Sequence, residues 1–449
     1  MFHKVVVANR GAVAARVLRA LDGLGVRSVA VYSDADADAP YLELASETYH
    51  IGAAPARESY LNEDAILEVL RVSHADGLHP GYGFLSENHR FAERVQAAGA
   101  CFVGPSPRWI EAMGHKTRAR DLAAQYGLPV GRGTGVPLKD APAMLRAADE
   151  IGYPVLVKPA AGGGGIGMIA VHKPEELAPA VERAASMAER GFANGEVYLE
   201  RLVERPRHVE IQVLGDRAGA VRHLFERDCS VQRRHQKIIE EAPGPGIARE
   251  VVEPLAADVA RVLGAMGYDN IGTIEMLMGA DGEFSFLEMN TRLQVEHGVT
   301  EEVTGVDLVA AQLRSAAGEP LAEILPERMA IDGHAIQARV YAEDPKRFFP
   351  SPGPLHVFRP PQDDGIRLET GYREGQQVTP HYDPLLAKVI AHAPTREAAI
   401  ARLTGALRGF DIQGVKHNVP ALVRILQSAE FQDGGVHTGL ASEVLARAQ

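Results

Sequence analysis

The chain has 449 residues, of which 46% are hydrophobic and 24% are charged, and its formal net charge is −12. This balance is typical of a soluble globular protein, and the length suggests about three domains of ordinary size. The acidic charge argues against nucleic acid as the main partner, because binding to a phosphate backbone needs a basic surface.

The cysteine count and the hydropathy pattern indicate a compartment. Cys101 and Cys229 are the two cysteines, too few for a disulfide framework, which favours a reducing cytoplasm. The N-terminus lacks a signal-peptide pattern, and no apolar run approaches the ~20 residues that span a bilayer. We therefore expect a cytoplasmic protein with no membrane partner.

The N-terminal part begins with a strand, a helix and a second strand, predicted at Val5–Ala8, Ala12–Leu24 and Ser28–Tyr32. This order predicts an α/β fold that opens with a Rossmann-like parallel sheet covered by helices. A further strand at Cys101–Val103 ends at the turn signal Gly104-Pro105. We place the first domain at residues 1–113.

The rest of the chain is predicted to form two more domains, at residues 114–315 and 334–441. The first of these contains a small α/β subdomain at about residues 130–203. Its helices are predicted at Lys116–Tyr126, Pro174–Arg190 and Val251–Met266, and its strands at Val155–Lys158, Val197–Leu199, Val209–Leu214 and Phe284–Glu288. The last domain is predicted from strands at His334–Tyr341, Leu355–Arg359 and Ala387–Ala391 and a helix at Arg396–Leu407.

A glycine loop follows the strand that ends at Lys158. Gly162–Gly165 and Gly167 lack Cβ atoms, so their amides can approach a polyphosphate closely, and Lys158 would offset its charge. The spacing is neither that of a P-loop nor that of a dinucleotide fingerprint. The alternative is a flexible surface loop. Lys116 is a weaker candidate for the same role.

Beyond Glu275, an acid, an amide, a cation, an amide and an acid follow one another at even-numbered positions, namely Glu288, Asn290, Arg292, Gln294 and Glu296. In an extended chain, residues two apart share one face. Carboxylate and amide oxygens suit Mg²⁺, a planar arginine suits a small oxyanion, and a second acid can act as a base. The alternative is a half-exposed edge strand whose polar face forms salt bridges.

A basic segment at residues 226–237 concentrates arginines, a histidine and Lys237 in an acidic protein. A local cationic patch of this kind suggests a bound anion, and the alternative is a solvated charged loop. Cys229 lies in this segment, but the sequence imposes no Cys/His pairing on it, so we expect a structural role.

Taken together, these segments resemble the biotin carboxylases, members of the ATP-grasp family, over essentially the whole chain. The stretches that carry the resemblance are 8–11, 79–88, 102–105, the loop after Lys158, 207–212, 226–237, 288–297 and 341–345. The resemblance implies an N-terminal biotin carboxylase domain, an ATP-grasp domain whose 130–203 subdomain is a mobile lid, and a C-terminal biotin carboxylase domain.

The resemblance also implies roles for named residues. ATP would be bound by Lys116, Lys158, Gly164, Gly165, Glu200, Arg201, Leu202, Val203, His208, Gln232, His235, Glu275 and Glu288. Mg²⁺ or Mn²⁺ would be held by Glu275, Glu288 and Asn290, and bicarbonate by Lys237, Arg292, Gln294 and Val295. Glu296 would be the base, Arg339 would bind biotin and steady its enolate, and Tyr82 and Asp383 would lie near biotin or the interface.

The activity that the resemblance implies is the ATP- and bicarbonate-dependent carboxylation of biotin, through carboxyphosphate, as the first half-reaction of an acetyl-CoA or other acyl-CoA carboxylase. The expected partners are a biotin carboxyl carrier protein, carboxyltransferase subunits and a second copy of the chain. Ala12, Ile166 and Gly298 depart from the usual pattern and leave the final acceptor open, including a urea-type carboxylase. The rivals are another ATP-grasp ligase and a non-catalytic ATP-binding subunit.

Overall fold

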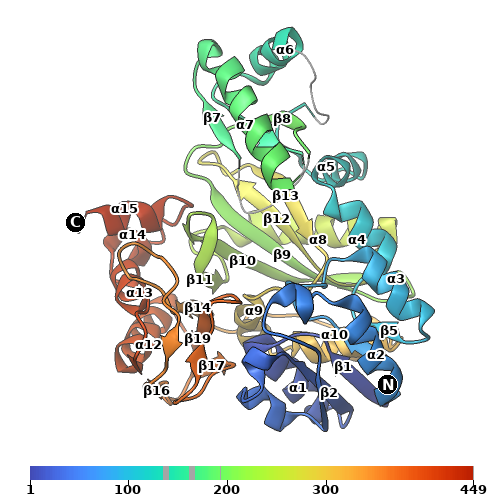
Figure 1. Ribbon diagram of the computed structural model, residues 1–449. Coiled ribbons are helices and arrows are strands. Elements are labelled where there is room, and N and C mark those ends of the chain that lie inside the picture. Colours follow the sequence, from blue (N-terminus) through green and yellow to red (C-terminus); the bar gives the residue numbers. More distant parts are fainter. Residues whose placement is uncertain (135–140, 161–166, 193, 448–449) are drawn as a thin grey trace.

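The computed structural model describes residues 1–134, 141–160, 167–192 and 194–447. Two larger sheets with their helices form the lower body of the molecule, and a small sheet with two helices projects above it (Figure 1). Gly164 and Gly165 of the predicted glycine loop lie outside the described residues. Within those residues, no helix combines the length and the apolar character needed to cross a bilayer.

The N-terminal sheet confirms the predicted parallel arrangement. Its strand order is β3-β2-β1-β4-β5, and every neighbouring pair is parallel. Val5, Val6 and Val7 are fully buried because helices cover both faces of the sheet. The strands are β1 (Lys4–Val7), β2 (Arg27–Tyr32), β3 (Glu47–His50), β4 (Gly77–His79) and β5 (Cys101–Phe102), and the helices are α1 (Gly11–Gly23), α2 (Glu63–Ser73), α3 (His89–Ala97) and α4 (Pro107–Gly114).

The projecting part is a three-stranded antiparallel sheet in the order β7-β6-β8, accompanied by two helices. Its elements are α6 (Ala141–Ile151), β6 (Val155–Pro159), β7 (Ile169–Val171), α7 (Leu177–Phe192) and β8 (Val197–Arg201), and α5 (Lys116–Gln125) connects it to the body. Val155, Val157, Ala184 and Leu199 form a separate apolar core for this part. A core of its own allows it to hold its shape independently of the body.

The largest sheet has eight strands in the order β13-β12-β9-β10-β11-β14-β19-β17, and all neighbouring pairs are antiparallel. It joins residues from 207 to 393 through the pairing of β11 with β14. Its strands are β9 (Arg207–Gly215), β10 (Val221–Arg233), β11 (Gln236–Ala242), β12 (Asn270–Met278), β13 (Phe284–Asn290), β14 (His334–Tyr341), β17 (Ile366–Thr370) and β19 (Leu385–Ala393).

Helices and short strands surround this sheet. The helices are α8 (Arg249–Met266), α9 (His297–Thr304), α10 (Leu308–Ala316), α11 (Leu321–Ile324), α12 (Arg396–Gly409), α13 (Val419–Leu426), α14 (Ala429–Gln432) and α15 (Leu440–Ala446). The short strands are β15 (Gly353–Pro354), β16 (Val357–Arg359), β18 (Gln377–Val378) and β20 (Asp411–Gln413). A core that includes Ile336, Val389, Leu403 and Leu422 fixes α12 and α13 to the sheet.

One local expectation was wrong, and one alternative is excluded. The extended face predicted to run from Glu288 to Glu296 ends at Asn290, because the chain leaves β13 there and turns before α9 begins at His297. The basic segment at residues 226–237 is not a charged loop: most of it forms β10 and the start of β11, and Arg227 is fully buried.

A buried ion network links the largest sheet to the turn before α9. Lys388 on β19 faces Glu369 on β17 across the sheet, forms an ion pair with it and is fully buried. The Lys388 ammonium also donates to the Val295 carbonyl oxygen at 2.8 Å. Burial lowers the pKa of Lys388. The opposing carboxylate and carbonyl are therefore needed to keep its charge in the interior.

Breaking this pair should destabilise the protein strongly. Lys388→Met leaves Glu369 short of its principal buried counter-charge, a loss of about 3 kcal/mol that should lower the melting temperature by about 5 °C or more. The matched control is Lys416→Met, which removes an exposed ion pair to Asp344 and should change the melting temperature little. Equal melting of the two variants in calorimetry would contradict the stabilising role of the buried pair.

Candidate active site

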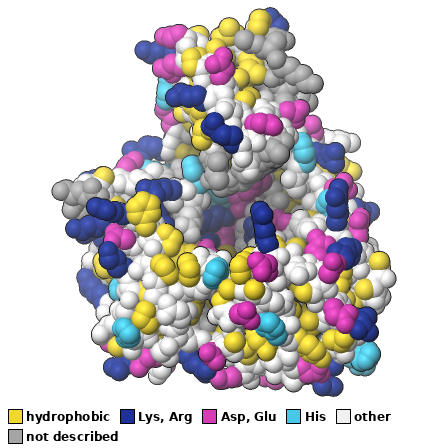
Figure 2. Space-filling view, in the orientation of Figure 1, with side chains coloured by type: hydrophobic (Ala, Val, Ile, Leu, Met, Phe, Trp, Pro, Cys, Tyr) yellow, Lys and Arg dark blue, Asp and Glu magenta, His cyan; other side chains and the backbone are white. Residues whose placement is uncertain are grey.

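Carboxylates gather on one face of the largest sheet, where Figure 2 shows the molecule hollowed between the projecting part and the body. Glu275 on β12 lies opposite Glu210 on β9 and opposite Glu288 on β13. Residues that pair directly across neighbouring strands point to the same face. The register of three strands therefore brings three acids side by side.

Lys237, near the start of β11, sits among these acids. Its Nζ lies 2.8 Å from Glu275 Oε1 and 2.8 Å from Glu296 Oε1, and it also contacts Glu210. Burial alone would lower the pKa of Lys237, but these carboxylates raise it well above its usual value. One permanently charged ammonium therefore holds together two strands and the turn before α9.

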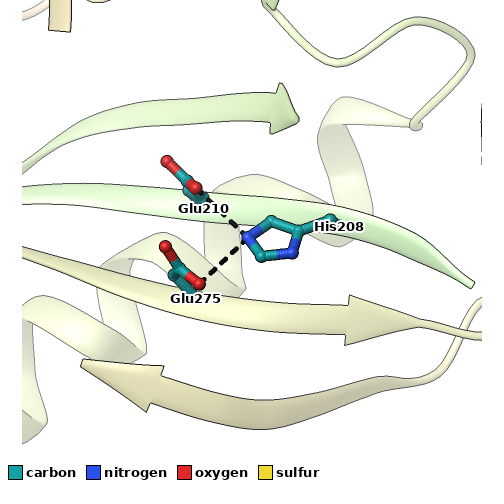
Figure 3. A group of neighbouring side chains, drawn as sticks. All are labelled: His208, Glu210 and Glu275. Atoms are coloured by element: carbon teal, nitrogen blue, oxygen red, sulfur yellow. Dashed lines mark hydrogen bonds and ion pairs between the residues drawn. The ribbon is translucent and has the colours of Figure 1, made fainter. Parts of the chain in front are cut away.

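His208 adds a second positive charge to the cluster. Its Nε2 lies 3.2 Å from Glu210 Oε1 and 3.2 Å from Glu275 Oε2, as Figure 3 shows. Burial opposes protonation, but Glu275 and Glu210 raise the pKa of His208 to about 9. The imidazole is therefore protonated at neutral pH. It acts here as a counter-ion, although its spacing to the two acids would also suit a metal ligand.

Glu296 receives a cation on each oxygen. Lys237 contacts Oε1, and Arg339 Nη2 donates to Oε2 at 3.0 Å. Arg339 also pairs with Glu240 through Nε at 2.5 Å. Burial would raise the pKa of Glu296, but Lys237 and Arg339 lower it to about 2. Glu296 is therefore ionised at neutral pH.

Arg292 lies at the edge of the cluster. Its Nε donates to Glu87 Oε2 at 2.9 Å and its Nη2 to Asn290 Oδ1 at 2.8 Å. The Asn290 and Gln294 amides in turn donate to Glu275 Oε1, at 2.7 and 3.0 Å. The turn after β13 thus brings the predicted residues of this region together.

The acids at the open end of the cluster fit a divalent cation. Burial and the nearby Glu275 raise the pKa of Glu288, which means that the nearby cations do not fully offset the negative potential at this end of the cluster. Lys116 Nζ is 3.7 Å from Glu288 Oε2 and offsets it only in part. Two carboxylates and an amide oxygen form the kind of donor set that Mg²⁺ takes together with phosphate oxygens.

The predicted nucleotide residues are divided between the projecting part and the body. Lys158 on β6 pairs with Glu200 on β8 at 2.7 Å, and Arg201 donates to the Gly152 and Tyr153 carbonyls at 2.6 and 2.7 Å. Glu200, Arg201 and Val203 line a hollow of about 620 Å³, and Leu202 lies between Arg201 and Val203 in the chain. Among the described residues, Lys158 makes no hydrogen bond or ion pair with Lys237 or the acids around it.

Two further predicted residues lie in the hairpin of β10 and β11. Gln232 is buried, pairs in register with Lys237 and donates to the Cys229 carbonyl at 2.9 Å. His235 is exposed in the turn of the hairpin. Gln232 therefore supports the strand that carries Lys237, whereas His235 faces solvent.

A cavity of about 460 Å³ adjoins the cluster on the other side of Arg339. Tyr82, Val295, Asp383 and Arg339 line it together, although they come from distant parts of the chain. The Arg10 guanidinium lies 4.2 Å from the centre of the Tyr382 ring in the same wall. Aromatic walls with arginine donors suit a flat, neutral ring with a polar carbonyl group.

Sequence reasoning missed several members of the cluster. Glu210 contacts Lys237, and Glu240 contacts Arg339. Glu87 contacts Arg292. Arg227 is fully buried and donates to Gln294 Oε1 at 2.7 Å. The two-residue spacing from His208 to Glu210 was the available signal, because it places both on one face of a strand.

Comparisons with known proteins agree with this geometry. Residues 1–110 match the family of biotin carboxylase N-terminal domains, residues 115–324 the ATP-binding domain of the carbamoyl-phosphate synthase L chain, and residues 337–443 the biotin carboxylase C-terminal domain. Biotin carboxylase 2 of Bacillus subtilis is 48% identical over 98% of both chains. The mitochondrial methylcrotonoyl-CoA carboxylase subunit alpha of Rattus norvegicus is 46% identical over 97% of this chain and 61% of its own length.

A solved structure shares the whole architecture. The biotin carboxylase domain dimer of Hydrogenobacter thermophilus 2-oxoglutarate carboxylase, in complex with MgADP, ADP and bicarbonate, superimposes with a TM-score of 0.95. It is 42% identical to this chain and is covered over 99% of both lengths. On these matches and on the three-part fold, the chain belongs to the biotin carboxylase family.

Proposed function

We propose that this protein carboxylates biotin on a separate carrier protein, using ATP, Mg²⁺ and bicarbonate. The observation that carries the proposal is the position of Glu296. It lies between the Lys237 ammonium and the Arg339 guanidinium, with the carboxylates suited to Mg²⁺ on one side and the 460 Å³ cavity on the other. A base in that position lies close to bicarbonate bound on one side and to biotin bound on the other.

In the first step, bicarbonate becomes a mixed anhydride of carbonic and phosphoric acids. Arg292 and Lys237 hold the anion, and Glu296 accepts its proton. A bicarbonate oxygen then attacks the γ-phosphorus of ATP, the bond to ADP breaks, and carboxyphosphate forms. Glu296 is ionised and enclosed by the protein, and it becomes a stronger base once the bound anion shares the charge of Lys237.

The residues that would hold the metal are Glu275, Glu288 and Asn290. When bound there, Mg²⁺ would offset the negative charge of the ATP phosphates. Lys116 lies beside Glu288 and would contact the same phosphates. Lys158, Gly164, Gly165 and the residues Glu200–Val203 would close over the nucleotide from the projecting part, acting as a lid that keeps water from carboxyphosphate.

In the second step, carboxyphosphate breaks down to CO₂ and phosphate. The phosphate removes the proton from the ureido nitrogen of biotin, and that nitrogen bonds to the carbon of CO₂. Arg339 stabilises the negative oxygen of the biotin enolate that forms in between. Tyr82 and Asp383 would line the biotin site next to it.

The proposed reaction stops at carboxylated biotin and does not include a final carboxyl acceptor. The relatives belong to different carboxylases, from methylcrotonoyl-CoA carboxylase to 2-oxoglutarate carboxylase. We propose that a carrier protein and carboxyltransferase subunits complete the reaction in the cytoplasm, and that two copies of the chain form a dimer. Another ATP-grasp ligase would share the ATP and metal residues, and the 460 Å³ cavity beside Arg339 favours biotin instead.

The central test is ATP cleavage that depends on bicarbonate and rises when free biotin is added. Arg292→Ala should lower this rate by about 100-fold or more, because it removes a preorganised charge that holds the anion. Arg292→Lys keeps the charge but loses the planar donors, so its rate should lie between that of Arg292→Ala and that of the unmodified protein. A near-normal rate in Arg292→Ala would refute the assignment, and ATP cleavage indifferent to bicarbonate would refute the function.

The metal assignment predicts a separate effect. Glu288→Gln should raise the Mg²⁺ concentration needed for half-maximal ATP cleavage by about 10-fold or more, because it removes one of two anionic oxygen donors. Glu250→Gln, which changes an exposed acid in the first turn of α8, is the matched control and should leave the requirement unchanged. An unchanged requirement in Glu288→Gln would place the metal elsewhere.

A further inference from the structure

A cluster of exposed cations stands out on this acidic protein. Arg234, Lys346, Arg347 and Arg424, with the exposed ring of Phe349, form a surface that we call the basic shoulder. Together they line two adjacent hollows of about 530 and 360 Å³. Lys and Arg side chains gather around apolar ones near α15 on the left of Figure 2, beside the central hollow.

The charge of the basic shoulder is not neutralised locally. Among the described residues that line the two hollows, none is acidic. Arg234, Lys346, Arg347 and Arg424 also have no ion-pair partner in the part of the chain that the structure describes. Other surface cations are equally unpaired, but these share one concave surface. In a chain of net charge −12, such a surface suits an acidic partner.

The loop that carries this charge has a fixed shape. The Lys346 and Arg347 amides donate to Asp344 Oδ1 at 3.0 and 2.8 Å, and the Asp344 amide donates to the Phe349 carbonyl at 2.9 Å. Lys416 holds the same aspartate at 2.6 Å. Phe349 remains 61% exposed in this rigid turn. An exposed aromatic ring within a preorganised charged rim is typical of a protein-binding surface.

A short connection joins the basic shoulder to the 460 Å³ cavity. Arg233 lines one hollow, and its Nη2 donates at 2.9 Å to Gln236 Oε1. Gln236 lines the cavity together with Arg339. The turn of the β10 and β11 hairpin therefore lies between the two, and a partner seated on the shoulder stands beside the cavity mouth.

We propose that the basic shoulder docks the protein domain that presents biotin, through an acidic face of that domain with an apolar contact on Phe349. The proposal rests on the proposed function, because only a protein that carboxylates biotin needs a biotin-bearing partner. Charge at the rim would speed the encounter, and the seated domain would direct its biotin into the adjacent cavity.

The test compares a biotinylated carrier protein, purified from the source organism through its biotin group, with free biotin as substrates. Lys346→Glu combined with Arg347→Glu should raise KM for the carrier and so lower its kcat/KM by about 10-fold or more. The kcat/KM for free biotin should stay within about twofold of that of the unmodified protein. Raising the ionic strength should reduce the carrier reaction of the unmodified protein more than that of the variant.

The matched control is Arg57→Glu combined with Arg90→Glu, two exposed arginines of the N-terminal part, which should change neither substrate. An unchanged carrier reaction in the shoulder variant, or an equal fall with both substrates, would overturn the docking proposal. Absence of any biotin-stimulated reaction in the unmodified protein would instead overturn the proposed function.

A second measurement tests the contact directly. A photoreactive benzophenone side chain in place of that of Phe349 should cross-link the carrier protein, and the same group in place of the Arg90 side chain should not. A cross-link to a second copy of the chain, or none to the carrier, would overturn the proposal.

Discussion

The Lys237 ammonium lies among three carboxylates, Glu210, Glu275 and Glu296, and the candidate site depends on this arrangement. Acids brought so close in the interior would repel one another and lose their charge without a cation between them. Lys237 and the protonated His208 keep them ionised. The result is a dense, charged and largely dry cluster that can exchange contacts with incoming anions and metal ions.

The same eight-stranded sheet fixes both ends of this cluster. Glu275 and Glu288 lie on β12 and β13 at one edge, and Arg339 lies on β14, beyond β11. Glu296 lies between these acids and Arg339, and the hydrogen bond from Lys388 to the Val295 carbonyl fixes the turn that carries it. The distance between the nucleotide end and the biotin end is thus set by strand order, while the projecting part, with its own core, can provide the cover.

Much of this arrangement follows from the sequence, and the rest depends on contacts that local patterns do not carry. The βαβ opening predicted the parallel sheet, and the two-residue spacing predicted that Glu288 and Asn290 share a face. That spacing failed after Asn290, where a turn, not a strand, brings Arg292 and Glu296 to the cluster. Glu210 was missed because cross-strand register, which places it opposite Glu275, cannot be read from one strand alone.

The proposed reaction requires that bicarbonate, and not water, attacks the γ-phosphorus of ATP. The direct measurement is ATP cleavage in bicarbonate whose oxygens are ¹⁸O, with mass analysis of the released phosphate. Carboxyphosphate breaks between carbon and the bridging oxygen, so each phosphate should retain one oxygen atom from bicarbonate. Phosphate that carries no ¹⁸O, released at the same rate, would contradict the claim.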